Sequence, residues 1–446
     1  MTEPAAEAPN APAMTVRGAI FLGVGSMVGA GIFALLGEAG TVAGAAVWMS
    51  FALAGIVTGL IGYTVVKLGV RYPSSGGLIA YLIAGFGNGR LVGIASWLGY
   101  MSAIVIVGAM VAVSFGSYAT SLFIGDDAGA AWDNVFTTAV ILGTLGINLI
   151  GSRIVDRAQT AIVLTELAVF AVFIVATITS VDWSLLSFGG YPPFSDIVAS
   201  VALTFFAFLG FSVITFSAGD LADPARGLPR AMYTALGVAG GLYILISLGV
   251  FGTLPVEKVV GYGETAIAEA ARPSLGDAGF VMMAIAAVLA TTSSVNATLY
   301  ASGGLTGMLA EVGQFPPVFG RRFHGAHNGL LITAGLVLIV ANLVDLSAIA
   351  SVGSAIALMV FVLVGLAGYR RRADTGARAS IVIAAIVASV VVLVFFAMDT
   401  LRNDPATFVA IVVIAALAVA LDYTWKRRRP TAAVTSDASE LPAPRR

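Results

Sequence analysis

Apolar runs long enough to cross a lipid bilayer recur along almost the whole of this chain. A transmembrane helix needs about 20 predominantly apolar residues, and stretches of that kind follow one another from residue 17 to residue 425. Of the 446 residues, 59% are hydrophobic and 11% are charged, which is more apolar surface than a soluble domain can bury. The sequence therefore predicts an all-α polytopic membrane protein.

Twelve transmembrane helices are predicted from this pattern. They lie near residues 17–37, 43–69, 91–121, 134–150, 158–180, 194–220, 231–253, 276–308, 329–344, 347–368, 379–398 and 405–425. Polar, alanine- and proline-rich segments flank them at both ends of the chain. We expect residues 1–16 to be a disordered N-terminus and residues 426–446 to be a disordered basic tail.

Lysine and arginine are distributed unevenly over the predicted loops. With a cytoplasmic N-terminus and twelve spans, one side of the membrane carries every basic residue except Lys258, Arg272 and Arg402. Cytoplasmic loops are enriched in lysine and arginine. We therefore expect a multi-pass protein of the cell membrane with both termini in the cytoplasm. The net charge of −1 gives no sign of a nucleic-acid partner, and the absence of cysteine excludes disulfides and thiolate metal sites.

The glycine-rich segment GVGSMVGAGIF (residues 23–33) lies inside the first predicted helix, where glycine costs about 0.5–1 kcal/mol relative to alanine. One interpretation is close helix packing, because Gly25 and Gly29 form a GxxxG pattern. The other is a helix broken near the bilayer midplane, whose free N–H groups hold an anionic ligand group. The segment alone leaves both open.

A second interrupted segment, TFFAFLGFSVITFSAG (residues 204–219), follows five spans later and favours the broken helix. Transporters built from two inverted repeats interrupt the first helix of each repeat. Twelve helices divide on this scheme into a first repeat at 17–180, a second at 194–368 and two further helices at 379–425. Helices one and six are then the discontinuous pair.

Four motifs together resemble the amino acid–polyamine–organocation (APC) superfamily of permeases, over about residues 17–425. They are GVGSMVGAGIF (23–33), YPSSGGLIAYL (72–82), FFAFLGFSVITFSAGDLADPARGLPRA (205–231) and TTSSVNATLYASGGLTGMLA (291–310). The resemblance implies a leucine-transporter-like fold of five plus five inverted helices, with two helices added at the C-terminus. It also implies a small-molecule amino acid as the substrate and alternating access as the mechanism.

The resemblance also implies a substrate site between the two broken helices. The N–H groups of Ala30, Gly31 and Ile32 would bind a carboxylate, and carbonyls of helix six would bind the amino group. The expected substrate-binding residues are Ser26, Met27, Val28, Gly29, Ala30, Gly31, Ile32, Phe205, Phe206, Ala207, Phe208, Gly210 and Ser212. Because Ser212 stands where some cation-selective relatives are acidic, small or apolar neutral amino acids are the expected substrates.

Glu166 is a carboxyl in the middle of the fifth predicted helix, where a charge costs roughly 2.5–3.5 kcal/mol on insertion scales. Many proton-driven relatives carry a lysine at the position to which counting from Gln159 leads, so this chain reverses the charge. Two ion-coupling roles stay open. Glu166 could bind and release a proton, which we favour, or it could coordinate sodium with Gly25, Ser293 and Ser294.

Two aromatic and four charged residues are the expected gates. Phe206 and Phe208 would close over the ligand, and ion pairs at the cytoplasmic end would stabilise one state of the cycle. The charged residues are Asp220, Asp223, Arg226 and Arg230.

The predicted function is secondary active transport of amino acids, with no cofactor besides the coupling ion. The alternatives are a sodium-coupled or exchange-type permease for another small organic cation, and a non-transporting amino acid sensor of the same fold. An enzyme is not expected, because no histidine or cysteine lies in any predicted span. The sequence leaves the oligomeric state open.

Overall fold

The chain is almost entirely helical in a computed structural model that describes residues 14–427 except 75, 126–127, 151–154 and 324–325. The long helices and their flanking segments are α1 (Val16–Ala43), α2 (Val47–Arg71), α4 (Arg90–Tyr100), η2 (Met101–Ile106), α5 (Val107–Phe123), α6 (Ala130–Ile150), α7 (Val155–Ile178), α8 (Phe194–Ala207), η4 (Leu209–Asp220), α9 (Pro224–Thr253), α12 (Arg272–Glu311), α14 (Asn328–Leu343), α15 (Leu346–Arg370), α17 (Ala379–Asn403) and α18 (Pro405–Arg427).

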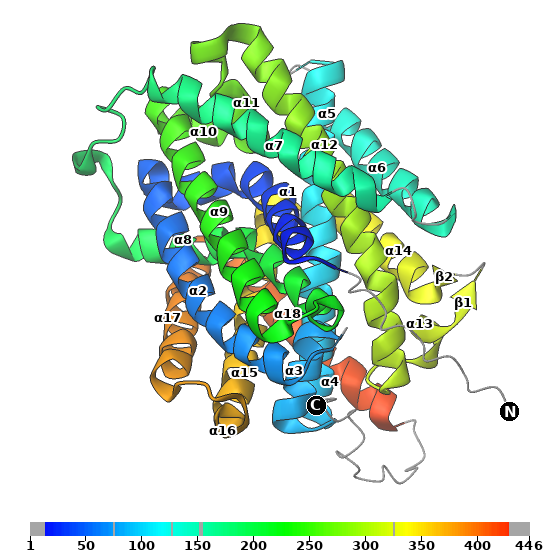
Figure 1. Cartoon of the computed structure of the whole chain (residues 1–446). Coiled ribbons are helices and arrows are strands. Elements are labelled where there is room, and N and C mark those ends of the chain that lie inside the picture. The colour runs from blue at the N-terminus through cyan, green and yellow to red at the C-terminus, as the bar shows by residue number, and fades with distance from the viewer. Residues whose placement is uncertain (1–13, 75, 126–127, 151–154, 324–325, 428–446) are drawn as a thin grey trace, which may run out of the picture.

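Short elements connect these helices. They are η1 (Gly44–Ala46), α3 (Gly77–Phe86), η3 (Phe188–Gly190), α10 (Val256–Tyr262), η5 (Gly263–Thr265), α11 (Ala266–Glu269), α13 (Pro317–Gly320), α16 (Arg372–Thr375) and the antiparallel strands β1 (Arg322–Phe323) and β2 (Ala326–His327). In Figure 1, α3, α4 and α16 lie at one end of the bundle, and α10 and α11 lie at the other.

Each of the twelve predicted spans coincides with a helix or a run of helices. Among the described residues, ten segments are long and apolar enough to cross a membrane, and the first of them, Val16–Arg71, contains both α1 and α2. The helix Asn328–Leu343 is apolar but shorter. The chain is thus a multi-pass membrane protein. The count of twelve crossings, the repeat boundaries and the side on which the termini lie stay predictions.

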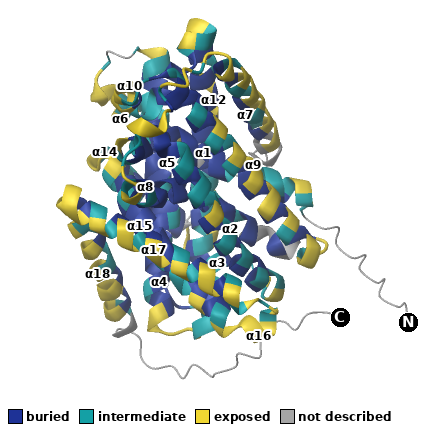
Figure 2. Cartoon of the chain, turned by 90° about the vertical axis from the view of Figure 1, so that its left-hand side faces the viewer, coloured by how far each residue is buried: buried dark blue, intermediate teal, exposed yellow. Residues whose placement is uncertain are grey.

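The centre of the bundle is formed by helices one and six. α1 packs against α8, η4, α9 and α12, and α2 packs against α8 and α9. Buried residues fill this centre, whereas exposed residues follow the outer faces (Figure 2). Apolar side chains such as Leu142 of α6 and Val412 of α18 are about half exposed, at 50% and 53%. Such side chains face the hydrocarbon in a membrane protein.

Helix one is unbroken, so the predicted discontinuity in it is wrong for this structure. α1 runs as one α-helix from Val16 to Ala43. Its glycines serve close packing instead: a β-carbon at Gly23 would lie 2.4 Å from the Ile214 side chain, and one at Gly29 would lie 2.8 Å from the Ala290 carbonyl oxygen. Small residues allow helices in lipid to approach closely, so glycine here does not require an unwound backbone.

Helix six changes its conformation where the sequence predicts an interruption. α8 ends at Ala207, and a 3₁₀ helix begins at Leu209. The Phe208 amide donates to the Phe205 carbonyl, and the Phe211 amide donates to the Phe208 carbonyl, which is the tighter i+3 pattern. Runs of 3₁₀ helix longer than 3–4 residues are uncommon, and in mid-helix they often mark a hinge. By this criterion, the start of the 12-residue η4 is the candidate hinge of helix six.

Candidate functional site

A cavity of about 110 Å³ lies between helices one, three, six, eight and ten of the bundle, next to the helix-six hinge. Its volume is below the roughly 300–1,000 Å³ of pockets for drug-sized ligands, which suits a ligand of few atoms. The residues that line it are Leu22, Gly25, Ser26, Gly76, Leu78, Ile79, Gly99, Ser102, Ala103, Ile104, Val107, Phe206, Leu209, Gly210, Ser212, Val213, Ser294, Ala297, Thr298, Ala301, Leu305, Ala357, Val360 and Phe361.

The lining is apolar except for a few hydroxyl groups, and none of its side chains carries a charge. Ser212 donates to the Leu209 carbonyl over 2.9 Å, and Ser102 donates to the Gly353 carbonyl over 2.9 Å. A hydroxyl that donates its proton to the backbone still has lone pairs with which to accept a hydrogen bond. The cavity can therefore hold a small uncharged or zwitterionic solute, but it offers no fixed charge to a cation.

The backbones of helices one and six are in close contact at the wall of this cavity. A β-carbon at Gly210 would lie 2.4 Å from the Ser26 carbonyl carbon and 2.5 Å from the Met27 nitrogen. Glycine at 210 is therefore required by the contact between the two backbones. Helices one and six thus meet at the wall of this cavity, and of the two only helix six is interrupted.

The structure divides the predicted substrate-binding residues into two groups. Ser26, Phe206, Gly210 and Ser212 line the cavity. The others pack around it: Met27, Val28, Ile32, Phe205, Ala207 and Phe208 are buried in the core, while Gly29 and Gly31 contact neighbouring helices. The side chain of Ala30 lies outside the described part of the chain.

The amide groups of Ala30, Gly31 and Ile32 are not available as predicted, because all three residues lie within the unbroken α1. A continuous helix presents the N–H groups of its interior to its own carbonyls. Because the helix is continuous, its glycines point to different neighbours. Gly25 and Ser26 face the cavity. Gly29 faces α12, and Gly31 faces α8 and α9. Carboxylate binding by these amides stays a prediction that needs a different conformation of helix one.

Of the two predicted aromatic gates, one lies at the cavity. Phe206 lines it, and its ring packs against Gly353 of α15: a β-carbon at Gly353 would lie 2.5 Å from the Phe206 Cζ. Phe208 is instead fully buried against Tyr243, with ring centroids 5.0 Å apart. With 3.6 residues per turn, side chains two positions apart point to roughly opposite sides of a helix, so Phe206 and Phe208 face different neighbours.

The four predicted ion-coupling residues lie on α1, α7 and α12. Gly25 and Ser294 line the cavity, whereas Glu166 is not among its lining residues. The Glu166 side chain is 3% exposed and lies in α7, which packs against α1, α9 and α12. No hydrogen-bond partner for its Oε2 is present among the described residues. Ser293 neighbours the lining residue Ser294 on α12.

Of the four residues predicted to form a gate of ion pairs, two make an ion pair among the described side chains, and that pair is exposed. Asp223 and Arg226 are 3.8 Å apart and 55% and 81% exposed, respectively. Asp223 caps α9 by accepting from the Arg226 amide, and Arg230 lies exposed one turn further on. The Asp220 side chain lies outside the described part. Exposed pairs contribute about 0–1 kcal/mol, so Asp223 is better explained as a helix cap.

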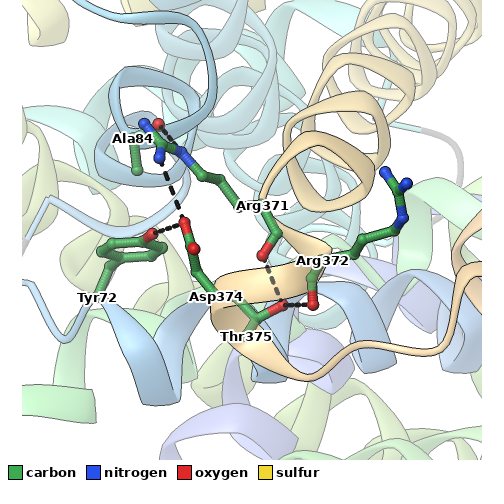
Figure 3. A network of polar contacts seen from close by, with 6 residues as sticks. All are labelled: Tyr72, Ala84, Arg371, Arg372, Asp374 and Thr375. Atoms are coloured by element: carbon green, nitrogen blue, oxygen red, sulfur yellow. Dashed lines mark hydrogen bonds and ion pairs between the residues drawn. The ribbon is translucent and has the colours of Figure 1, made fainter.

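The short helix α3 covers one end of the cavity, which the sequence did not predict. Leu78 and Ile79 of α3 line it, together with Gly76 just before. Arg371, after α15, donates to the Ala84 carbonyl over 2.6 Å and pairs with Asp374 at 3.3 Å (Figure 3). Tyr72, at the end of α2, donates to the same Asp374 carboxylate over 3.3 Å. The network therefore ties α3 to helices two and ten.

A second feature absent from the sequence predictions is the π-helical segment η2 in helix three. It carries Ser102, Ala103 and Ile104 to the cavity wall. Single π-helical turns inside α-helices occur frequently at functional sites. No sequence signal marked this segment, because MSAIVI reads as part of an ordinary apolar helix.

The bundle, the hinge in helix six and the small central cavity define the class: a polytopic transporter of small molecules. Residues 14–417 match the amino acid permease family, and the chain belongs to this family within the APC superfamily.

Three relatives of this chain are named transporters. The inner membrane transport protein YbaT of Escherichia coli is 31% identical over 84% of this chain and 88% of its own length. The methylthioribose transporter of Bacillus subtilis is 29% identical over 67% of each chain. The serine/threonine exchanger SteT of Bacillus subtilis is 27% identical over 67% of this chain and 68% of its own.

Proposed function

We propose that this protein is a secondary active transporter that moves small or apolar neutral amino acids across the cell membrane by alternating access. The observation that carries the proposal is the uncharged cavity at the hinge of helix six. A membrane carrier needs a ligand site at mid-depth beside an element that can change conformation, and such sites lie at interrupted helices.

Substrate size and charge are inferred from the cavity wall. Glycine, alanine and serine contribute much of the lining, so backbones approach closely and leave a space of about 110 Å³. A cationic amino acid would lose its hydration without gaining a carboxylate partner, which is costly in an apolar site. Serine and threonine hydroxyls can instead hydrogen-bond a zwitterion or a small hydroxylated side chain.

Coupling to protons is proposed to pass through Glu166. An isolated carboxylate is costly to bury, and binding a proton removes its charge. Intramembrane carboxyls commonly serve proton relays in transporters. Glu166 is not among the residues that line the cavity, and its Oε2 has no hydrogen-bond partner among the described residues. We take this to favour a proton over sodium, because sodium would need several oxygen ligands gathered around one point.

Exchange of one amino acid for another is the second candidate, and it is favoured by the relative named a serine/threonine exchanger. An exchanger uses the same cavity and hinge but returns to its starting state only when loaded. The two modes are distinguished by whether substrate leaves vesicles that contain no counter-substrate outside.

Substrate class is tested by thermal unfolding of the purified full chain with each of the twenty amino acids, at pH 5.5 and 7.5, with and without sodium. A ligand that binds the native state raises apparent stability by RT ln(1 + [L]/Kd), about 2.7 kcal/mol at 100 Kd. We expect alanine, serine or another small neutral amino acid to stabilise the protein without sodium. Stabilisation by arginine or lysine alone would contradict the proposal.

A further inference from the structure

A second cavity, of about 190 Å³, lies at the end of the bundle that carries α16 (Figure 1). None of its lining residues lines the central cavity, so the transport function proposed above does not use it. Three helices form its walls. Besides two valines, α2 contributes Lys67 and Arg71, α9 contributes Ala225 and Pro229, and α16 contributes Asp374 and Thr375.

Two cations on α2 line this cavity. Lys67 and Arg71 are four residues apart, so they lie one above the other on one face of the helix. The Lys67 Nζ is 5.9 Å from the centroid of the Tyr63 ring, and the Arg71 Cζ is 5.7 Å from that of the Tyr72 ring. Neither cation takes part in an ion pair among the described side chains. Both charges are therefore available to an anion.

The carboxylate in the lining is already engaged by other groups. Asp374 pairs with Arg371 at 3.3 Å and accepts a hydrogen bond from the Tyr72 hydroxyl over 3.3 Å (Figure 3). A carboxylate held in this way has less negative charge to offer to the two cations of α2. The positive charge inside the cavity is therefore not balanced by its own wall.

The wall formed by α9 adds further basic residues. Arg226 and Arg230 directly follow the lining residues Ala225 and Pro229, and both arginines are exposed. Asp223, at the start of the helix, lies 3.8 Å from Arg226 and is itself 55% exposed. In the described part of the chain, basic side chains thus outnumber acidic ones around this cavity.

An apolar strip, formed by Ile56, Leu60, Tyr63 and Tyr233, leads away from the cavity along α2 and α9. The three strip residues of α2 share a face with Lys67, and Ile56 is 61% exposed. Tyr233 of α9 is 43% exposed, and the two helices pack against each other. Exposed apolar side chains face hydrocarbon in a membrane protein, and tyrosine is enriched where hydrocarbon meets water. The cavity therefore lies where lipid head groups can reach it.

We propose that this cavity binds the head group of an anionic phospholipid, whose acyl chains lie on the apolar strip. Arginine binds phosphate through a fork of donors, and lysine binds it as a point charge. Basic residues near a membrane surface also attract anionic lipids. A zwitterionic lipid gains less, because the carboxylate that its cationic group needs, Asp374, is already paired. The bound lipid contacts α2, α9 and α16 together and so stabilises their packing.

The test measures lipid binding through thermal unfolding of the full chain in detergent, without any amino acid. Dioleoyl phosphatidylglycerol, dioleoyl phosphatidylcholine or soluble glycerol 3-phosphate is added in increasing amounts. A ligand of the native state raises the unfolding midpoint by mass action, so the amount needed for a given shift reports its affinity. The midpoint without lipid shows whether each variant is folded.

Three variants are compared with the unaltered chain. Lys67→Gln with Arg71→Gln removes both charges, and Lys67→Arg with Arg71→Lys keeps them. Arg90→Gln is the matched control, because Arg90 is an exposed basic residue at the same end of the bundle that lies over Tyr423 and outside this cavity.

We expect removal of both charges to raise the required amount of phosphatidylglycerol about thirtyfold, since each basic group near the membrane surface adds to the attraction. The charge-preserving variant and Arg90→Gln should stay within about threefold of the unaltered chain. Equal weakening by Arg90→Gln would overturn the proposal, because the effect would then belong to net charge and not to this cavity.

The choice of ligand supplies a second test that needs no variant. Phosphatidylcholine that stabilises the unaltered chain as well as phosphatidylglycerol does would overturn the proposal, even if the neutralised variant did not fold. Glycerol 3-phosphate that stabilises as well as the lipid would identify a soluble phosphate as the occupant and contradict a lipid site. None of these results depends on transport, so failure of the proposed function is recognised separately.

Discussion

Gly210 of helix six lies directly against the backbone of Ser26 in helix one, so closely that a β-carbon at Gly210 would be 2.4 Å from the Ser26 carbonyl carbon. Both residues line the cavity. The contact joins the hinge to the unbroken helix beside it. One part of the cavity wall is therefore formed where these two backbones meet.

Gly210→Ala should disrupt this fit, because the added methyl group meets main-chain atoms that cannot move aside independently. Overpacking of this kind costs about 1–3 kcal/mol. Thermal unfolding in detergent should show a lower midpoint, and ligand binding should weaken. Gly237→Ala is the matched control, since nothing lies within 4 Å of a β-carbon there. Equal stability of the two variants would show that the contact is looser than described.

Gly353→Ala should affect ligand binding more than folding. Its β-carbon would lie 2.5 Å from the Cζ of Phe206, and a ring tip can shift where a backbone cannot. We expect the Phe206 ring to move into the cavity and to weaken binding by about tenfold, or ~1.4 kcal/mol. Titration of the amino acid found in the thermal screen measures this. Gly335→Ala, which has open space around it, should bind normally.

Glu264 should make stability depend on pH at the end of the bundle that holds α10 and α11. Burial raises the pKa of the Glu264 carboxyl, and the nearby Glu38 and Asp133 raise it further. Because the folded pKa is raised, the stabilisation is complete at acid pH and is lost as pH rises from about 4 through the folded value. Glu264→Gln should therefore be more stable than the unaltered protein at neutral pH and match it near pH 4. A constant difference across pH would refute this.

Arg371→Ala should loosen the cover that α3 places over the cavity. The guanidinium bond to the Ala84 carbonyl is 2.6 Å long, and because Arg371 is itself half exposed we expect it to contribute about 0.5–1.5 kcal/mol, the range of an ordinary hydrogen bond. Maleimide labelling of Thr298→Cys should accelerate in this variant. Asp374→Asn removes only half-exposed contacts of 3.3 Å, worth less than about 1 kcal/mol, and should change labelling little. Faster labelling in Asp374→Asn than in Arg371→Ala would show instead that Asp374 holds α3 in place.

The helices were predictable because each apolar run must satisfy its backbone internally in lipid, which leaves the α-helix as the solution for a single segment. Glycine was ambiguous for a physical reason. The same residue permits close packing and an unwound backbone, and the choice at Gly29 and Gly31 is made by Ala290 and Ala207, which are far away in the sequence. Helix six could be identified because its glycine stands among bulky phenylalanines.

Within the site, Glu166 was recognisable because a carboxyl in an apolar helix is costly and therefore informative. Tyr243 carried no such signal, since a tyrosine in a membrane helix is ordinary until its hydroxyl is found at the Ala207 carbonyl. The cover formed by α3 and the π-helical η2 depends on packing between segments distant in the chain. Neither could be derived from local pattern.

Proton-driven uptake is the most direct test of the central claim. Proteoliposomes that contain the full chain, without sodium and with an imposed pH gradient that is acid outside, are supplied with radiolabelled L-alanine, L-serine or L-leucine. We predict that at least one of them accumulates above its external concentration, and that Glu166→Gln still exchanges this amino acid but no longer accumulates it. Entry of none of the three, or undiminished accumulation by Glu166→Gln, would contradict the account.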